Sequence, residues 1–180
     1  YDDIKHVKAN TKFWGQFIIS VALAILLPNF RINNFYGVLG LYSINVIPSV
    51  LFTSFVFIVV INAYNLIDGV DGLAATFAIF AFMMLGSAFQ YTHPHIFIFC
   101  ILLSVILMPF YFFNFSKTRK MFLGDTGALF LGLTIVLLVG FLLNSNNAVS
   151  TPFNMNRALF ALVSLCYPLL DTLRVFTLRL

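Results

Sequence analysis

The side chains best suited to chemistry lie together between Asn62 and Gly72, in a sequence that is otherwise strongly apolar. Two amides, Asn62 and Asn65, precede two carboxylates, Asp68 and Asp71, within these eleven residues. In hydrocarbon each charged side chain would cost roughly 2.5 to 3.5 kcal/mol, so the stretch must face water, an ion or a ligand. Carboxylate and amide oxygens are ligands that Mg²⁺ prefers. The pattern predicts a metal-dependent phosphoryl-transfer site at a membrane surface. The alternative, a simple Asp-Gly turn, explains one Asp-Gly pair but not two.

Two further acidic motifs lie at the start of the sequence and after residue 120. Asp2 and Asp3 are adjacent, and because like charges raise one pKa of such a pair, they could act as a general base or bind a metal. A solvated loop beside the membrane is the alternative. Asp125 lies between Gly124 and Thr126 at the start of an apolar run. Asp125 or Thr126 could cap a helix, or the helix N-terminus could bind an anion.

Two other polar groups have simple explanations. Asp171 stands three residues before Arg174, and an ion pair within one helix accounts for both without function, although a catalytic role remains open for Asp171. His93 and His95 flank Pro94. A metal site at these histidines would lack a third nearby ligand.

The composition predicts an integral membrane protein, because 61% of the residues are hydrophobic and only 9% are charged, against about a quarter in soluble domains. The predicted fold is all-α, a polytopic transmembrane helical bundle in which residues 1–180 form a single membrane domain. Cys100 and Cys166 fall inside apolar runs and are predicted to be buried thiols. The six predicted spans are residues 13–29, 46–63, 73–91, 95–113, 127–143 and 157–175.

The charges predict the orientation of these spans. An even number of crossings places residues 1–12, 64–72, 114–126 and 176–180 on one side. Eight of the ten lysines and arginines lie on or near that side, which identifies it as cytoplasmic. All six acidic residues are aspartates that lie there, or within about one helical turn of it in the case of Asp171. We therefore expect an acidic site on the cytoplasmic face of a cell inner membrane.

Four ordered blocks give the sequence a family resemblance. Together they resemble the polyprenyl-phosphate N-acetylhexosamine-1-phosphate transferase superfamily, glycosyltransferase family 4, and the last two are more similar to its N-acetylglucosamine-1-phosphate branch than to its muramoyl-pentapeptide branch. The blocks are Asp2-Asp3 with Lys12-Phe13-Trp14-Gly15-Gln16, Asn-x-x-Asn-x-x-Asp-Gly-x-Asp-Gly-Leu-Ala at 62–74, Phe122-Leu123-Gly124-Asp125-Thr126-Gly127, and Pro168-Leu169-Leu170-Asp171-Thr172.

The resemblance implies a reaction and its partners. The enzyme would transfer an N-acetylhexosamine-1-phosphate from a UDP-N-acetylhexosamine to undecaprenyl phosphate and release UMP, the first membrane step of cell-envelope polysaccharide synthesis. Mg²⁺ would be required, with Mn²⁺ as the alternative ion. Membrane lipid is an expected partner, nucleic acid is not, and a homodimer is compatible with the resemblance.

The resemblance also implies residue roles in catalysis. Asp2 would be the base that deprotonates the lipid phosphate, with Asp3 beside it, and Lys12 would assist with the phosphate charge. The reaction could proceed directly or through a phosphorylated aspartate.

Metal and substrate binding would fall to other residues. Asn65 and Asp125 would be metal ligands. Asp68 and Asp71 would hold the nucleotide region or the metal's surroundings, and Phe122 would stack on uracil.

Members of this superfamily have further spans before the Asp-Asp pair and a cytoplasmic histidine loop after the last span. We therefore expect the chain to be an internal fragment that is inactive alone. Two other classes are weighed against this interpretation. A cation-coupled transporter would carry acidic residues near span centres, and a membrane aromatic prenyltransferase would have longer spacings between its aspartates.

Overall fold

The computed structural model describes residues 9–69, 72–114, 121, 123–145, 149 and 151–179. Six α-helices account for most of them, with three short 3₁₀ helices in the connections. The 3₁₀ helices are η1 (Pro28–Phe30), η2 (Val38–Gly40) and η3 (Pro152–Asn154). The α-helices are α1 (Ala9–Leu26), α2 (Val46–Ile67), α3 (Leu73–Phe89), α4 (Pro94–Asn114), α5 (Gly124–Asn144) and α6 (Arg157–Arg179).

The helices confirm the predicted all-helical membrane bundle. Four of them, α2, α4, α5 and α6, are long and apolar enough to cross a membrane, and two shorter apolar helices cover Thr11–Leu26 and Leu73–Phe89. Large apolar side chains such as Ile47, Ile106 and Phe112 remain exposed on the outer faces of the helices. Hydrocarbon is the solvent that such faces require, and the chain is a multi-pass membrane protein.

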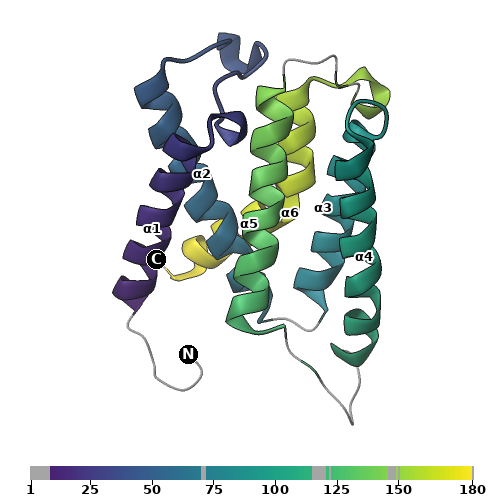
Figure 1. The fold of residues 1–180 in the computed structure, drawn as a ribbon. Coiled ribbons are helices and arrows are strands. Elements are labelled where there is room, and N and C mark those ends of the chain that lie inside the picture. The colour runs from purple at the N-terminus through teal and green to yellow at the C-terminus, as the bar shows by residue number, and fades with distance from the viewer. Residues whose placement is uncertain are drawn as a thin grey trace.

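The helices α2 and α5 pack closely in the middle of the bundle (Figure 1). Their contact depends on Gly132 of α5, where an added Cβ would lie 2.9 Å from the Cα of Ile61 and 3.3 Å from the Cβ of Tyr64. Tyr64, Phe57 and other fully buried side chains fill the core around this contact. Small residues permit such close backbone approach in membrane bundles, and here the approach fixes how α2 and α5 face each other.

One end of the bundle brings together the start of α1, the turn from α2 to α3 and the start of α5, at the bottom of Figure 1. We call it the site end. Helix α2 stops at Ile67, and Gly72 adopts a φ of 71° just before α3. Because this left-handed conformation suits glycine, Gly72 allows the chain to change direction between α2 and α3. Asn62 and Asn65 therefore lie in the last turns of α2, and Asp68 directly follows its last residue.

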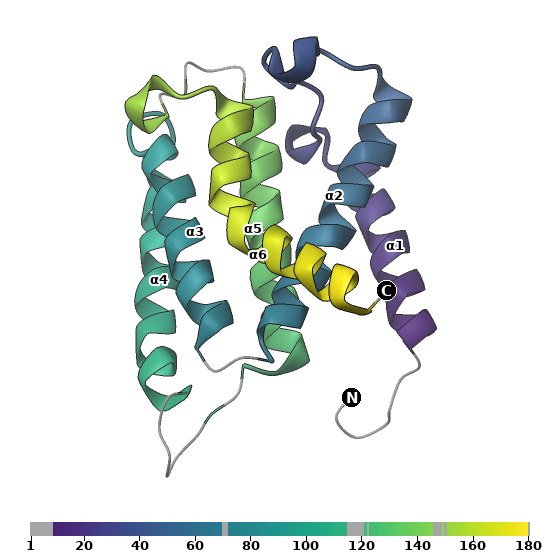
Figure 2. The same cartoon turned by 180° about the vertical axis from the view of Figure 1, so that it is seen from behind.

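Helix α6 continues to Arg179, past the predicted end of the final span at residue 175, and it is not straight (Figure 2). Pro168 lies inside it, where its ring has no N–H to donate to the carbonyl of Ser164 and forces a kink. The first half descends beside α5, and the second half turns aside across α2 in the direction of α1 (Figure 2). Cys166 is exposed just before the kink, so its predicted burial is wrong, whereas Cys100 is buried as predicted.

Candidate active site

Three helices each contribute a predicted site residue to one cavity at the site end. Lys12 lies in the first turns of α1, Asn65 near the end of α2, and Asp125 in the first turn of α5. The cavity has a volume of about 300 Å³. Its lining residues are Lys12, Phe13, Gln16, Asn62, Asn65, Asp125 and Leu129. The fold thus brings together residues that are up to 113 positions apart in the sequence.

Lys12 and Asp125 form an ion pair that joins α1 to α5. The Nζ of Lys12 donates to the Oδ2 of Asp125 at 2.6 Å, and the two side chains are 33% and 44% exposed. A pair with this much exposure contributes little to stability. Its importance is therefore its position, because it holds a cation against a carboxylate in the wall of the cavity.

Asp125 does not cap α5, so the capping alternative is wrong for this residue. The N-cap position is Leu123, no side chain bonds there, and Asp125 lies inside the first helical turn. A negative charge at this position is favoured by the helix dipole. Its carboxylate is consequently available to Lys12 and to ligands of the cavity. Thr126 is exposed and does not line the cavity.

Asp68 follows the last residue of α2 and comes under the influence of Asp125. Burial raises the pKa of the Asp68 carboxyl above its ordinary value, and the negative charge of Asp125 raises it further. A hydrogen bond from the backbone of Gly124 lowers the pKa in part. Because the charge of Asp125 disfavours the ionised form of Asp68, positive charge placed near both carboxylates would be stabilised.

The donor set fits a hard divalent cation. Asn65 and Asp125, an amide and a carboxylate, line the same cavity, and the charge of Asp125 acts on Asp68. Oxygen ligands of this type suit Mg²⁺, which usually keeps several waters and completes its coordination with substrate phosphates. Within the described ranges no group of three His, Cys, Asp or Glu side chains gathers to hold a metal. A site built from amide and substrate oxygens as well as carboxylates does not need one.

Sequence reasoning placed Gln16 and Asn62 in motifs but gave them no role. The structure pairs them in the cavity wall: Nδ2 of Asn62 donates to Oε1 of Gln16 at 2.8 Å. The spacing of these two amides from predicted site residues could have indicated them. Gln16 follows Lys12 by four residues and Asn62 precedes Asn65 by three, so each lies on the same helical face as a predicted site residue.

Several predicted site residues lie outside the described part of the chain. These residues are Asp2, Asp3, Asp71 and Phe122. Their assigned roles stay predictions.

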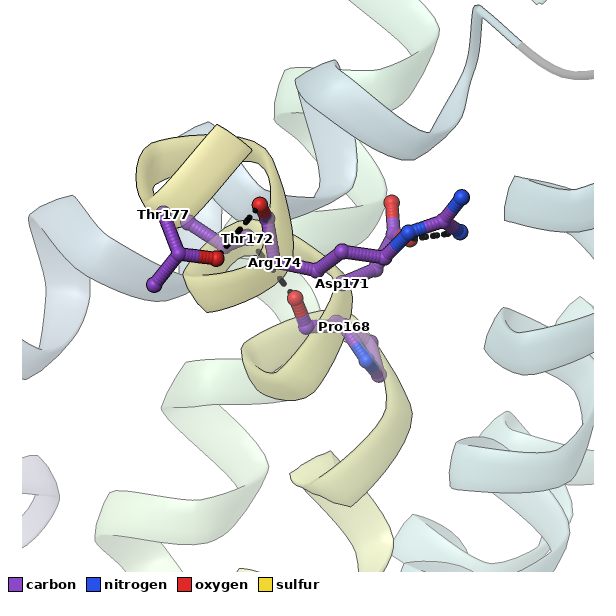
Figure 3. Close-up of polar contacts among 5 residues, drawn as sticks. All are labelled: Pro168, Asp171, Thr172, Arg174 and Thr177. Atoms are coloured by element: carbon purple, nitrogen blue, oxygen red, sulfur yellow. Dashed lines mark hydrogen bonds and ion pairs between the residues drawn. The ribbon is translucent and has the colours of Figure 1, made fainter. Parts of the chain in front are cut away.

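Asp171 has the simple partner that the sequence predicts. Its Oδ1 lies 3.7 Å from the Nη1 of Arg174, in the part of α6 that follows Pro168 (Figure 3). In the same segment Thr172 donates from its hydroxyl to the Pro168 carbonyl at 2.7 Å. Asp171 is not among the residues that line the cavity.

The histidines of the α3–α4 connection lie at the opposite end of the bundle, where the ring of His93 packs edge-on against Phe89 and Phe141. The described residues near His93 and His95 offer no metal cluster. The ring of His93 is packed among aromatic side chains, and its Nε2 is buried without a hydrogen-bond partner within the described residues.

Comparison with known proteins places this geometry in a family. Residues 1–142 match the family described as glycosyl transferase family 4. The phospho-N-acetylmuramoyl-pentapeptide-transferase of Staphylococcus epidermidis is 36% identical over an alignment of 127 residues, and the match covers 67% of this chain and 39% of the relative. The transferase of the same name from Wolbachia pipientis is 35% identical over an alignment of 144 residues, and the match covers 73% of this chain and 43% of the relative. A third, from Microcystis aeruginosa, is 42% identical over 82 residues, 46% of this chain and 23% of the relative.

The chain spans about two fifths of the length of the first two relatives. All three carry the name of the muramoyl-pentapeptide branch, whereas the last two sequence blocks favour the N-acetylglucosamine branch, so the branch stays a prediction. The family itself is shown by a match that covers the Asp-Asp motif, the asparagine and aspartate block and the start of α5. The chain belongs to glycosyl transferase family 4, the superfamily of polyprenyl-phosphate N-acetylhexosamine-1-phosphate transferases that its motifs predict.

Proposed function

We propose that the protein transfers a sugar-1-phosphate from a UDP-N-acetylhexosamine to undecaprenyl phosphate and releases UMP, with a divalent cation, Mg²⁺ or Mn²⁺, required. One observation carries this proposal. Lys12, Asn65 and Asp125 line one cavity at one end of a membrane bundle, so a cation, an amide and a carboxylate are available where a lipid head and a water-soluble donor can meet.

The chemistry requires two anionic phosphate compounds to approach each other. A phosphate oxygen of the lipid attacks the sugar-bearing phosphorus of the donor, and the bond from that phosphorus to the UMP oxygen breaks. Catalysis of such a transfer is mostly positioning and charge stabilisation. Lys12 binds phosphate oxygens and lowers their repulsion. Asn65 and Asp125, with Asp68 beside them, would hold the divalent cation, which supplies further neutralisation when bound.

A membrane location suits this pair of substrates. The isoprenoid chain stays among the helices, while its phosphate reaches the polar end of the bundle. The excess of basic residues in the segments at the site end supports a cytoplasmic orientation of that end, where UDP-sugars are available. A transporter is disfavoured, because Asp68 and Asp125 lie at helix ends and not at span centres.

The identity of the sugar has two candidates. The last two sequence blocks favour UDP-N-acetylglucosamine. The printed names of the relatives favour a UDP-N-acetylmuramoyl-pentapeptide donor. An assay with both donors, run side by side with the same lipid acceptor, distinguishes them.

UMP release from membranes that contain the full-length protein tests the proposal. We expect release only when undecaprenyl phosphate is supplied together with Mg²⁺ or Mn²⁺. We expect Asp125→Asn to lower the rate by at least about 100-fold, which is the usual effect of removing one group that stabilises charge in the transition state. Thr134→Ala is the matched control, because this hydroxyl bonds the Phe130 carbonyl of its own helix. Activity that persists in EDTA or in Asp125→Asn contradicts the assigned mechanism.

A further inference from the structure

An amide pair crosses from α1 to α2 in the wall of the cavity. Nδ2 of Asn62 lies 2.8 Å from Oε1 of Gln16 and also 2.8 Å from the backbone carbonyl oxygen of Ile58. Both side chains are half-buried and share the cavity with Lys12 and Asp125. Polar side chains in a membrane bundle are found where they bond across helices or serve a site. This pair does the first, and its location suggests the second.

The hydrogen bonds fix which end of each amide faces which partner. A backbone carbonyl can only accept, so the atom of Asn62 beside Ile58 must be its NH₂ group. The same NH₂ group donates to Gln16, so the atom that Gln16 presents must be its oxygen. This network removes the usual ambiguity of amide orientation. Because Oε1 accepts from Asn62, the Nε2 of Gln16 remains a donor. Nε2 makes no hydrogen bond within the described part of the chain.

The pair lies deeper in the membrane than the charged part of the site. Gln16 is four residues beyond Lys12 on α1, and Asn62 is three residues before Asn65 on α2. Helix α1 starts and α2 stops at the site end (Figure 1). Both amides are therefore about one helical turn, about 5.4 Å, further into the bundle. A lipid substrate reaches this level from the bilayer, whereas a nucleotide approaches from the water.

We propose that Gln16 binds the phosphate of the lipid substrate through its Nε2 group, and that Asn62 is a positioning residue that turns this donor toward the cavity. An amide suits this depth because it donates to a phosphoryl oxygen without adding a second buried charge beside Lys12. The inference rests on the proposed function and extends it, because it assigns the inner wall of the cavity to the lipid and the outer part to the nucleotide sugar.

The variant Gln16→Glu separates the two roles of this side chain. A glutamate still accepts from Asn62, so the link between α1 and α2 is kept, but the donor is replaced by an acceptor. At fixed detergent concentration we expect the KM for undecaprenyl phosphate to rise at least about tenfold, with the KM for the UDP-sugar within about twofold of the wild type. The matched control is Gln90→Glu, because Gln90 is exposed at the far end of α3 and both KM values should stay unchanged.

A second variant guards against a folding defect or a new ion pair between the glutamate and Lys12. Gln16→Met is uncharged and of similar length but lacks the donor, and we expect it to raise the KM for the lipid in the same selective way. Asn62→Asp cannot donate to Gln16 or to Ile58, and should produce a smaller selective rise. Thermal unfolding in detergent reports whether each variant folds.

The outcomes separate this inference from the proposed function. If the wild type releases no UMP in response to the lipid phosphate, the proposed function fails and the inference fails with it. If the wild type is active but Gln16→Glu and Gln16→Met leave the lipid KM unchanged, or raise both KM values equally, only the assignment of Gln16 is overturned.

Discussion

The pKa of Asp68 depends on its burial and on the charges around it. It lies just after α2, and its raised pKa is due first to burial and then to the charge of Asp125. Asp125 itself has a cation in contact, because Lys12 lies 2.6 Å away. Among these three described side chains, two carboxylates are therefore accompanied by one ammonium group. This local excess of negative charge would favour the divalent cation of the proposed function.

The raised pKa of Asp68 predicts a pH-dependent stability. Because the pKa in the folded protein lies above the ordinary value of 3.8, the folded state binds this proton more tightly than the unfolded state does. The associated stability is complete below the ordinary value and is lost as the pH rises through the raised pKa. In EDTA, Asp68→Asn should therefore unfold at a higher temperature than the wild type at pH 7, and the difference should shrink as the pH falls toward 4. A difference that is the same at both pH values contradicts this account.

At the scale of elements, the packing of α5 on α2 sets the distance across the cavity. Gly132 lies seven residues after Asp125, and its backbone contact Ile61 lies four residues before Asn65. The close approach at this glycine therefore lies about one to two turns from the site on both helices. A change there acts on the site through the separation of two helices.

We expect Gly132→Ala to push α5 away from α2. The new Cβ would lie 2.9 Å from the Cα of Ile61 and 3.3 Å from the carbonyl oxygen of Val60, and backbone atoms cannot turn aside as side chains do. Overpacking of this kind costs about 1 to 3 kcal/mol, so the Tm should fall together with the rate of UMP release. Gly15→Ala is the control for stability, because a Cβ at Gly15 meets nothing within 4 Å. An unchanged Tm for Gly132→Ala would show that the helices are less tightly apposed.

The sequence predicted the helices better than their contacts. Apolar runs located all six helices, although α2 continues to Ile67, four residues past the predicted end of its span. A hydropathy profile gives the length of an apolar run but not the direction of the helix axis, so it did not predict the kink at Pro168. The spacing of the polar residues pointed to Asn65, and the family resemblance grouped it with Lys12 and Asp125 in one site.

The pairing of side chains across helices could not be read from one sequence. Whether Lys12 meets Asp125, or Gln16 meets Asn62, depends on the rotation of each helix about its axis. That rotation is set by close contacts such as the one at Gly132, which join residues far apart in the chain. Spacing within a helix gives only the face on which a residue lies.

At the scale of the whole molecule, the site end and the opposite end should face different compartments. The native thiols, Cys100 and Cys166, are first replaced by serine, and one new cysteine is introduced at a time. Thr126→Cys, exposed at the start of α5, should react with a membrane-impermeant maleimide only after the inner membrane is opened. Tyr91→Cys, at an 80% exposed position between α3 and α4, should react when the inner membrane is intact. The reverse pattern would place the site outside the cytoplasm.

The contact between Lys12 and Asp125 has a consequence for the resting enzyme. The Lys12 ammonium group gives the Asp125 carboxylate a counter-ion that belongs to the protein itself. In the proposed cycle this counter-ion would moderate the repulsion between Asp125 and Asp68 whenever the site holds no divalent cation. The carboxylates would then stay in place for the next lipid and nucleotide without a bound ion.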